Sequence, residues 1–145
     1  MDHYPPAESN CESHHGGEPC VVNIPRVARR NQNFRSVLWT GHHLQMTLMC
    51  IPARGEIGVE AHPDADQFIR VEQGEALACV GERRDGLDLQ CRLGVGDGVF
   101  VPCGTWHNIR NTGSCPLKLS SIYAPPQHAK GTVHSTKEDA GHEDH

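Results

Sequence analysis

The chain has 145 residues, of which 37% are hydrophobic, and a formal net charge of −5 at neutral pH. This length fits one domain, and no apolar run approaches the roughly 18 residues that a membrane-spanning helix needs. Because phosphate recognition requires a basic surface, the negative charge argues against nucleic acid as a partner.

Residues 1–20 are predicted to form a polar N-terminal extension. The stretch has neither a basic n-region nor an apolar h-region, so no secretory signal is visible and we expect a cytoplasmic protein. Seven cysteines without a CxxC spacing favour neither a disulfide framework nor a zinc finger, and we expect reduced thiols. Three of them, Cys50, Cys79 and Cys91, lie in apolar surroundings typical of buried strand residues.

Residues 21–126 are predicted to form an all-β domain. A basic cluster, Arg26, Arg29 and Arg30, is interpreted as a solvated edge beside its first strand. Leu87 to Leu93 and Leu44 to Ile51 alternate with the period of half-buried strands. Further strands are expected at 34–39, 67–72, 75–80, 98–101, 107–110 and 117–123. Since Gly and Pro turns separate these short strands at near-regular spacing, the sequence predicts a sandwich or barrel.

Residues 127–145 are predicted to form a polar, histidine-containing C-terminal tail. Neither this tail nor residues 1–20 has the apolar density that offsets the entropy of ordering. We expect both segments to be mobile or draped over the core. Their histidines are interpreted as solvated side chains rather than as a site.

Four histidines remain in the central domain. His42 and His43 occupy a hairpin turn, and because neighbouring strand residues point to opposite faces, a surface-loop interpretation is favoured. Glu60 and His62 are two residues apart, so both project to the same face if the segment is extended. His107 begins a strand after a turn.

One further polar residue and the turn before His107 also stand out. Gln67 shares a face with apolar Ile69 and Val71, which predicts an inward amide that needs a partner. Pro102 and Gly104 form the tight turn that precedes His107.

These residues carry a resemblance to the cupin superfamily of small β-barrels. The second cupin motif, G-x5-P-x-G-x2-H-x3-N, is matched at every fixed position by Gly96, Pro102, Gly104, His107 and Asn111. The first motif, G-x5-H-x-H-x3-4-E-x6-G, is matched by His62 and Gly74, with Glu60 in place of its first histidine and Gln67 in place of its glutamate. The chain is similar to single-domain cupins described as mannose-6-phosphate isomerase-like, and the resemblance extends over 21–126.

The resemblance implies a double-stranded β-helix, or jelly-roll, barrel that holds a divalent metal. Carried over by position, the ligands are Glu60, His62, Gln67 and His107. Two imidazoles and a carboxylate suit Fe(II), and also Mn(II), Ni(II) or Zn(II). The alternative is that the motif persists only as scaffold, with Glu60 in solvent and the histidines hydrogen-bonded inside the barrel.

Three functions remain open. The first is an enzyme that acts on a small sugar-like or dicarbonyl substrate by isomerase-type Lewis-acid chemistry, with Glu60 or Tyr123 moving a proton; Fe(II)-dependent dioxygenation is its alternative. The second is a non-catalytic cupin that binds a small ligand. The third is a structural protein with an inactive site. In each case we expect a homodimer, because a small barrel has edge strands to cover and cupins resemble one another in pairing through them.

Overall fold

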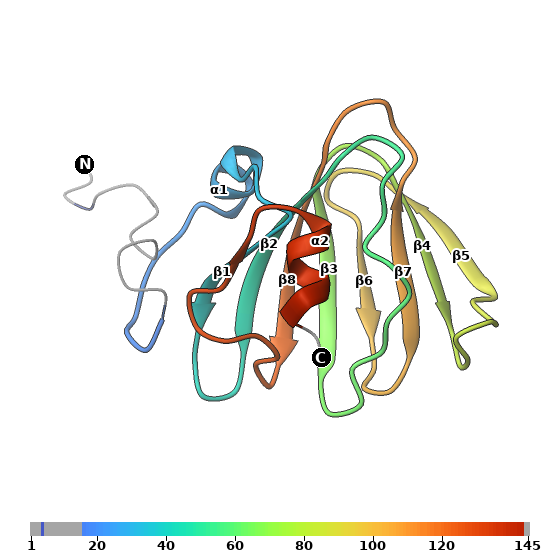
Figure 1. Cartoon of the computed structure of the whole chain (residues 1–145). Helices are drawn as coiled ribbons and strands as arrows, with labels where there is room; N and C mark the ends of the chain where they lie inside the picture. The colour runs from blue at the N-terminus through green and yellow to red at the C-terminus, as the bar shows by residue number, and fades with distance from the viewer. Residues whose placement is uncertain (1–3, 5–15, 144–145) are drawn as a thin grey trace.

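The computed structural model describes Tyr4 and residues 16–143; most of the predicted extension 1–20 and residues 144–145 lie outside the described residues. Within that range two antiparallel sheets form, one with the strand order β6-β3-β8-β2-β1-β9 and one with the order β5-β4-β7 (Figure 1). The strands are β1 (Arg35–Thr40), β2 (Gln45–Ile51), β3 (Asp66–Gln73), β4 (Ala76–Gly81), β5 (Leu89–Leu93), β6 (Gly98–Val101), β7 (Trp106–Asn111), β8 (Leu117–Ala124) and β9 (Val133–His134). The prediction of an all-β jelly-roll barrel is confirmed.

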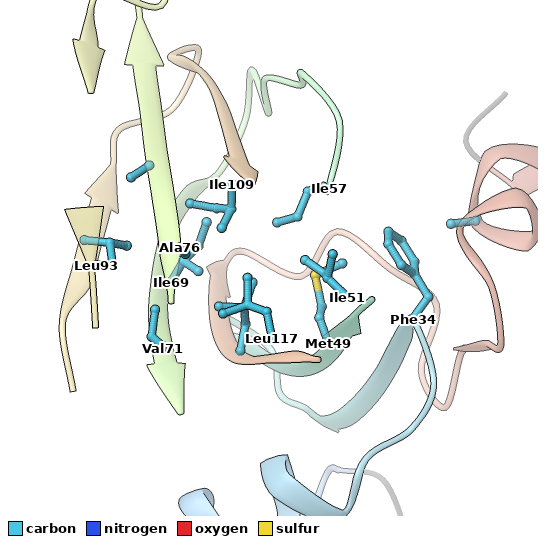
Figure 2. Close-up of a cluster of buried hydrophobic side chains, with 13 residues drawn as sticks. Phe34, Met49, Ile51, Ile57, Ile69, Val71, Ala76, Leu93, Ile109 and Leu117 are labelled. Carbon is cyan, nitrogen blue, oxygen red and sulfur yellow. The ribbon is translucent and has the colours of Figure 1, made fainter. Parts of the chain in front are cut away.

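The apolar core lies between the two sheets. Figure 2 shows Ile69, Val71 and Leu117 of the larger sheet meeting Ile109 and Leu93 of the smaller one. These side chains come from alternate positions of each strand, as the period of two requires. The eight strands expected from the sequence all form, each within two residues of its expected ends.

Helix α1 (Ile24–Arg30) covers the outer face of the larger sheet and was not predicted. Its N-cap is Asn23, whose side-chain oxygen accepts a hydrogen bond from the Arg26 amide at 3.1 Å. Its buried residues Val27 and Ala28 pack on the outer side of β1 and β2. The three arginines of the basic cluster are exposed, as expected, but they lie in this helix rather than beside a strand.

Two expectations about cysteines are corrected. Cys91 is exposed rather than buried, because β5 pairs only with β4 and is an edge strand. Cys20 is disulfide-bonded, whereas Cys50, Cys79, Cys91, Cys103 and Cys115 are free thiols. The partner of Cys20 lies outside the described residues, and sequence spacing gives no sign of which cysteines the fold brings together.

Residues 127–143, which the sequence sets apart as a tail, lie against the barrel. Gln45, fully buried on β2, donates to the His128 carbonyl at 2.7 Å, and its side-chain oxygen accepts from the amides of Gln127 and His128. The strand β9 then pairs with β1, and helix α2 (Lys137–Glu143) buries Ala140 against the core. Among the residues that the structure describes, neither helix has the length and apolar composition that crossing a bilayer requires.

Candidate metal centre

The backbone brings Glu60 beside His107. The Glu60 amide donates to the His107 carbonyl at 3.0 Å, and the His107 amide donates to the Glu60 carbonyl at 2.9 Å. Residues that exchange both hydrogen bonds in an antiparallel pair project their side chains to the same face. The Gly104 amide also donates to the His62 carbonyl at 2.8 Å, which ties the turn before His107 to the segment that carries the two other candidate ligands.

Three side chains therefore converge inside the barrel. The Oε1 atom of Glu60 lies 3.4 Å from the Nε2 atom of His62 and 3.5 Å from the Nε2 atom of His107. One donor atom from each of the three lies within 4.8 Å of the other two. Contacts of 3.4–3.5 Å are too long for well-formed hydrogen bonds but leave room for one ion between them.

The orientation of His107 suits a metal ligand. Its ring is buried, and its Nδ1 atom faces the Thr105 carbonyl oxygen at 3.2 Å. Since a carbonyl oxygen only accepts, Nδ1 carries a proton. Nε2, which faces Glu60, is the atom that would bind a metal when the ring is neutral, and it points its N–H toward the carboxylate when the ring is protonated. That Nε2 atom has no hydrogen-bond partner in the described part of the chain.

The charge of Glu60 also suits a ligand. Burial alone would raise the pKa of its carboxyl group, but hydrogen bonds and positive charge from His107 and His62 outweigh burial. The pKa is held well below its usual range as a result. Glu60 is thus an ionised carboxylate that can bind a cation without first losing a proton. The alternative in which Glu60 points into solvent does not describe this structure, because the carboxylate faces both imidazoles.

Gln67 lies on β3, with its side chain inside the barrel as predicted. Its Nε2 atom donates to the hydroxyl of Ser121 at 2.9 Å, which fixes the orientation of the amide. The amide oxygen is buried and has no hydrogen-bond partner among the described residues. An unpartnered buried acceptor costs about 1–3 kcal/mol, so this oxygen remains available to coordinate a ligand.

Tyr123 of β8 is fully buried beside this cluster rather than at the mouth of the barrel. It pairs in register with Gln67, and its ring meets the His62 ring edge-on at 5.2 Å. Burial, reinforced by the negative charge of Glu60, raises the pKa of the Tyr123 hydroxyl far above its ordinary value. The hydroxyl therefore keeps its proton at physiological pH.

Sequence reasoning missed several polar residues inside the barrel. His128, set aside with the terminal histidines, meets the Tyr123 ring at 5.2 Å, and burial together with the charge of Arg35 lowers its pKa to about 4. Arg35 and Thr47 are buried on β1 and β2 with unpartnered polar atoms. The alternation of Arg35 with Val37 was a signal that could have shown it to be inward-facing.

Comparison with known proteins finds a matching family, two proteins of similar sequence and a similar crystal structure. The cupin domain family matches residues 47–123 of the chain. Protein YrkC of Bacillus subtilis (strain 168) is 51% identical over 126 residues, which are 87% of this chain and 68% of YrkC. Protein L612 of Acanthamoeba polyphaga mimivirus is 36% identical over 83% of this chain and 74% of its own length. The crystal structure of BH2720 from Bacillus halodurans, 54% identical, superposes with a TM-score of 0.87 over 88% of this chain and 97% of that one.

Proposed function

The chain belongs to the cupin family, and from this we propose that it is a metal-dependent enzyme acting on a small polar substrate by Lewis-acid chemistry of the isomerase type. The proposal rests on one observation: Glu60, His62 and His107 converge on one point. Two buried polar atoms at this end of the barrel, Gln67 Oε1 and His107 Nε2, have no hydrogen-bond partner among the described residues. Glu60, His62 and His107 would hold the ion, with the Gln67 amide oxygen as a fourth donor. One carboxylate and two imidazoles accept Fe(II), Mn(II), Ni(II) or Zn(II).

The residues around the ion have separable roles in this proposal. A bound divalent metal supplies polarisation of a substrate carbonyl or hydroxyl oxygen. Glu60 faces both histidines through Oε1 and would hold the ion through that atom, while its second carboxylate oxygen would take the proton from the substrate carbon. Tyr123 supplies the opposite role, because it keeps its proton and can only donate. Its hydroxyl is protonated, buried and close to His62, and it donates to the substrate oxygen on which charge develops.

A second function is favoured by one specific observation. The set of two histidines and one carboxylate is the arrangement that non-haem Fe(II) oxygenases use. With Fe(II) in the site, the alternative activity is dioxygenation of the same class of small substrate.

The test measures whether a carbon-bound hydrogen of the substrate exchanges with deuterium from the solvent. Full-length protein is loaded in turn with Zn(II), Mn(II), Ni(II) and Fe(II) and incubated in D2O with a panel of hydroxyaldehydes, hydroxyketones, dicarbonyls and hydroxy acids. Isomerase chemistry through an enediol exchanges the C–H next to the carbonyl, so deuterium enters substrate or product. Oxygen uptake with Fe(II) alone, without exchange, would replace this proposal with the dioxygenase. Metal-dependent binding without either reaction would replace it with a ligand-binding cupin.

Two variants make this test specific. His62→Ala/His107→Ala removes two ligands and should abolish turnover with every metal. His42→Ala/His43→Ala is the matched control, because it removes two exposed imidazoles outside the centre and should leave turnover unchanged. Equal activity of the two variants would place the reaction elsewhere.

We propose in addition that the protein is a homodimer that pairs through the outer face of β6 and β3. Phe100 is 79% exposed there and stacks on Phe68 with ring centroids 4.5 Å apart. Strand β6 is an edge of its sheet, which supports pairing at this side. Analytical ultracentrifugation should give a dimer for the wild type and a monomer for Phe100→Glu, with Leu89→Glu, at another exposed apolar position, as the control. A monomeric wild type at micromolar concentration would contradict this.

A further inference from the structure

Residues 125–132, here called the strap, connect β8 to β9 at the polar end of the barrel. The far end of the strap is fixed to β1, because the Val37 amide donates a hydrogen bond to the Thr132 carbonyl at 2.8 Å. Its middle is fixed by Gln45 of β2, whose side chain is fully buried. The strap is therefore part of the folded barrel, although its sequence is that of a polar tail.

The side-chain amide of Gln45 makes every hydrogen bond that it can. Its Nε2 atom donates to the His128 carbonyl at 2.7 Å and to the Thr40 hydroxyl at 2.9 Å. Its Oε1 atom accepts from the Gln127 amide at 3.2 Å and from the His128 amide at 3.0 Å. A side-chain amide has two N–H donors and two acceptor lone pairs, so all four are used. A buried amide that is fully satisfied in this way fixes the backbone of His128 in one position.

The fixed backbone places the His128 ring against the Tyr123 ring. The two ring centroids lie 5.2 Å apart, and the ring planes are nearly perpendicular at 79°. On its contact with His62 the Tyr123 ring has the same centroid distance, 5.2 Å, and an angle of 85°. The Tyr123 hydroxyl and the His128 Nε2 atom have no hydrogen-bond partner among the described residues. At these atoms the two rings are therefore held by packing rather than by hydrogen bonds.

The two histidines that contact Tyr123 differ in what holds them. His62 belongs to the group that converges with Glu60 and His107, and it would bind the ion. His128 is not a member of that group, and Gln45 holds it whether or not an ion is bound. His128 therefore gives the Tyr123 ring a contact that does not depend on the metal.

We propose that Gln45 and His128 are positioning residues for the reaction: Gln45 holds His128, and His128 holds the Tyr123 ring so that its hydroxyl points its proton at the substrate oxygen. The inference rests on the proposed function, in which Tyr123 is the proton donor. His128 acts through the packing of its ring and binds neither the ion nor the substrate.

The test observes the Tyr123 ring directly. The chain has two tyrosines, so full-length protein made with 13C-labelled tyrosine rings gives two sets of ring signals. Tyr4 is 85% exposed and is the internal reference. A buried ring flips only when its neighbours move apart, so the flip rate of Tyr123, measured by relaxation dispersion, reports how firmly the ring is held.

Variants separate the ring of His128 from its nitrogen atoms. His128→Ala removes the ring and should raise the flip rate about tenfold or more, and Gln45→Met, which removes four hydrogen bonds, should do the same. His128→Phe keeps a planar ring without nitrogen and should stay within about threefold of wild type. Lys130→Ala removes an exposed side chain of the strap and is the matched control, which should leave the rate unchanged. If Gln45→Met does not fold, the two His128 variants decide the comparison.

A double-mutant cycle tests whether His128 acts through Tyr123. On a substrate of the D2O panel, His128→Ala should lower kcat about tenfold or more and leave KM within about threefold, because a proton donor acts in the transition state. Metal uptake should be unchanged. Tyr123→Phe should lower kcat further than His128→Ala does, and adding His128→Ala to Tyr123→Phe should cause no additional loss.

Three outcomes would overturn the proposal. They are a Tyr123 flip rate that is unchanged in His128→Ala, a flip rate in His128→Phe as high as in His128→Ala, and a full additional loss of kcat when His128→Ala is added to Tyr123→Phe. If the wild type turns over no substrate of the panel, the proposed function fails, and the flip rates alone then support or overturn the hold of His128 on Tyr123.

Discussion

The two ends of the barrel interior are built from the same strands but differ in chemistry. Along β2 the inward positions change from Gln45 and Thr47 to Met49 and Ile51, and β3 and β8 make the same change from polar to apolar residues. At the apolar end, buried side chains from both sheets pack on one another (Figure 2). At the polar end, five buried nitrogen or oxygen atoms in the described residues lack a hydrogen-bond partner: Thr47 Oγ1, Gln67 Oε1, His107 Nε2, Tyr123 Oη and His128 Nε2. A sixth such atom, Arg35 Nε, belongs to a residue that pairs in register with Met49.

This difference separates the residues that stabilise the fold from those that serve a ligand. Apolar burial contributes about 25 cal/mol per Å² of surface removed from water, so the packed end supplies folding free energy. Unpartnered polar atoms reduce that free energy, which a folded protein tolerates where a ligand completes the bonds. The predictions below test whether the two ends respond to substitution in opposite ways.

The largest expected effect is at the apolar end. Leu119 is fully buried in the core, and Leu119→Ala should lower the free energy of unfolding by about 2–5 kcal/mol through lost burial and a cavity. Urea denaturation measures this, with Leu89→Ala, 61% exposed, as a control that should change stability by less than about 0.5 kcal/mol. Below the unfolding transition the Leu119→Ala protein should still take up metal; loss of uptake would mean that the two ends are not separable.

The next effect is a pH dependence at the polar end. His128 has its pKa lowered from 6.5 to about 4, first by burial and then by Arg35 and by the nearby histidines His62 and His134, against the opposing charge of Glu60. Between pH 6.5 and 4 the unfolded chain therefore binds a proton at His128 and the folded chain does not. The free energy of unfolding is highest above pH 6.5 and decreases as the pH falls toward 4. At about 1.4 kcal/mol per pKa unit the full loss is about 3.5 kcal/mol, of which about 2.5 kcal/mol is lost between pH 7 and 4.5.

Urea midpoints between pH 7 and 4.5 measure this loss, and the ring resonances of His128 report its pKa. His128→Asn should flatten the pH dependence in this range. Titration of His128 near its ordinary value of 6.5 would contradict the burial on which the prediction rests.

A smaller effect is expected at Gln67. Gln67→Glu replaces the unpartnered amide oxygen by a carboxylate and should tighten Zn(II) binding about tenfold, or about 1.4 kcal/mol, while lowering the stability of the metal-free protein. Isothermal titration calorimetry measures the affinity. Gln73→Glu, a half-buried glutamine at the other end of β3, is the control and should leave it unchanged. An unchanged affinity in Gln67→Glu would exclude this oxygen from the centre.

The smallest effect is at Thr47. Because its buried hydroxyl has no partner among the described residues, Thr47→Val should change the free energy of unfolding by less than about 1 kcal/mol, in the stabilising direction. Ser120→Ala is the matched control: its buried hydroxyl donates to Glu72 at 2.7 Å, and its removal should cost about 1–2 kcal/mol. If both variants lower the free energy of unfolding by the same amount, the Thr47 hydroxyl already has a hydrogen-bond partner in solution, and the prediction is wrong.

Much of the fold could be predicted from local pattern. Alternation located β2 and β5, and short apolar runs between turn residues located the other strands from β1 to β8. The half-burial expected of β5 is not found, because this edge strand is exposed except at Leu93. Glu60 and His62 could be placed on one face from their spacing, whereas His107 joins them through the resemblance to the cupin motifs. In the structure the Gly104 amide donates to the His62 carbonyl, which ties the turn before His107 to that segment.

The remainder depends on contacts that spacing does not encode. Helix α1 has seven residues, too few to show a periodic pattern. His128 reaches the site because Gln45, far away in sequence, holds its backbone with two hydrogen bonds. Alternation can show that Arg35 points inward, but its place next to His134 depends on the pairing of β9 with β1.

The most direct test of the account is the metal content of the untagged, full-length protein. Wild type, His62→Ala/His107→Ala and His42→Ala/His43→Ala are stripped with chelator, dialysed against equal Zn(II), Mn(II), Ni(II) or Fe(II), and measured by elemental mass spectrometry. The chain has 11 histidines, so the difference between variants, rather than the total, identifies the site. The account predicts one more ion per chain in the wild type and in His42→Ala/His43→Ala than in His62→Ala/His107→Ala. Equal metal in all three proteins would contradict it.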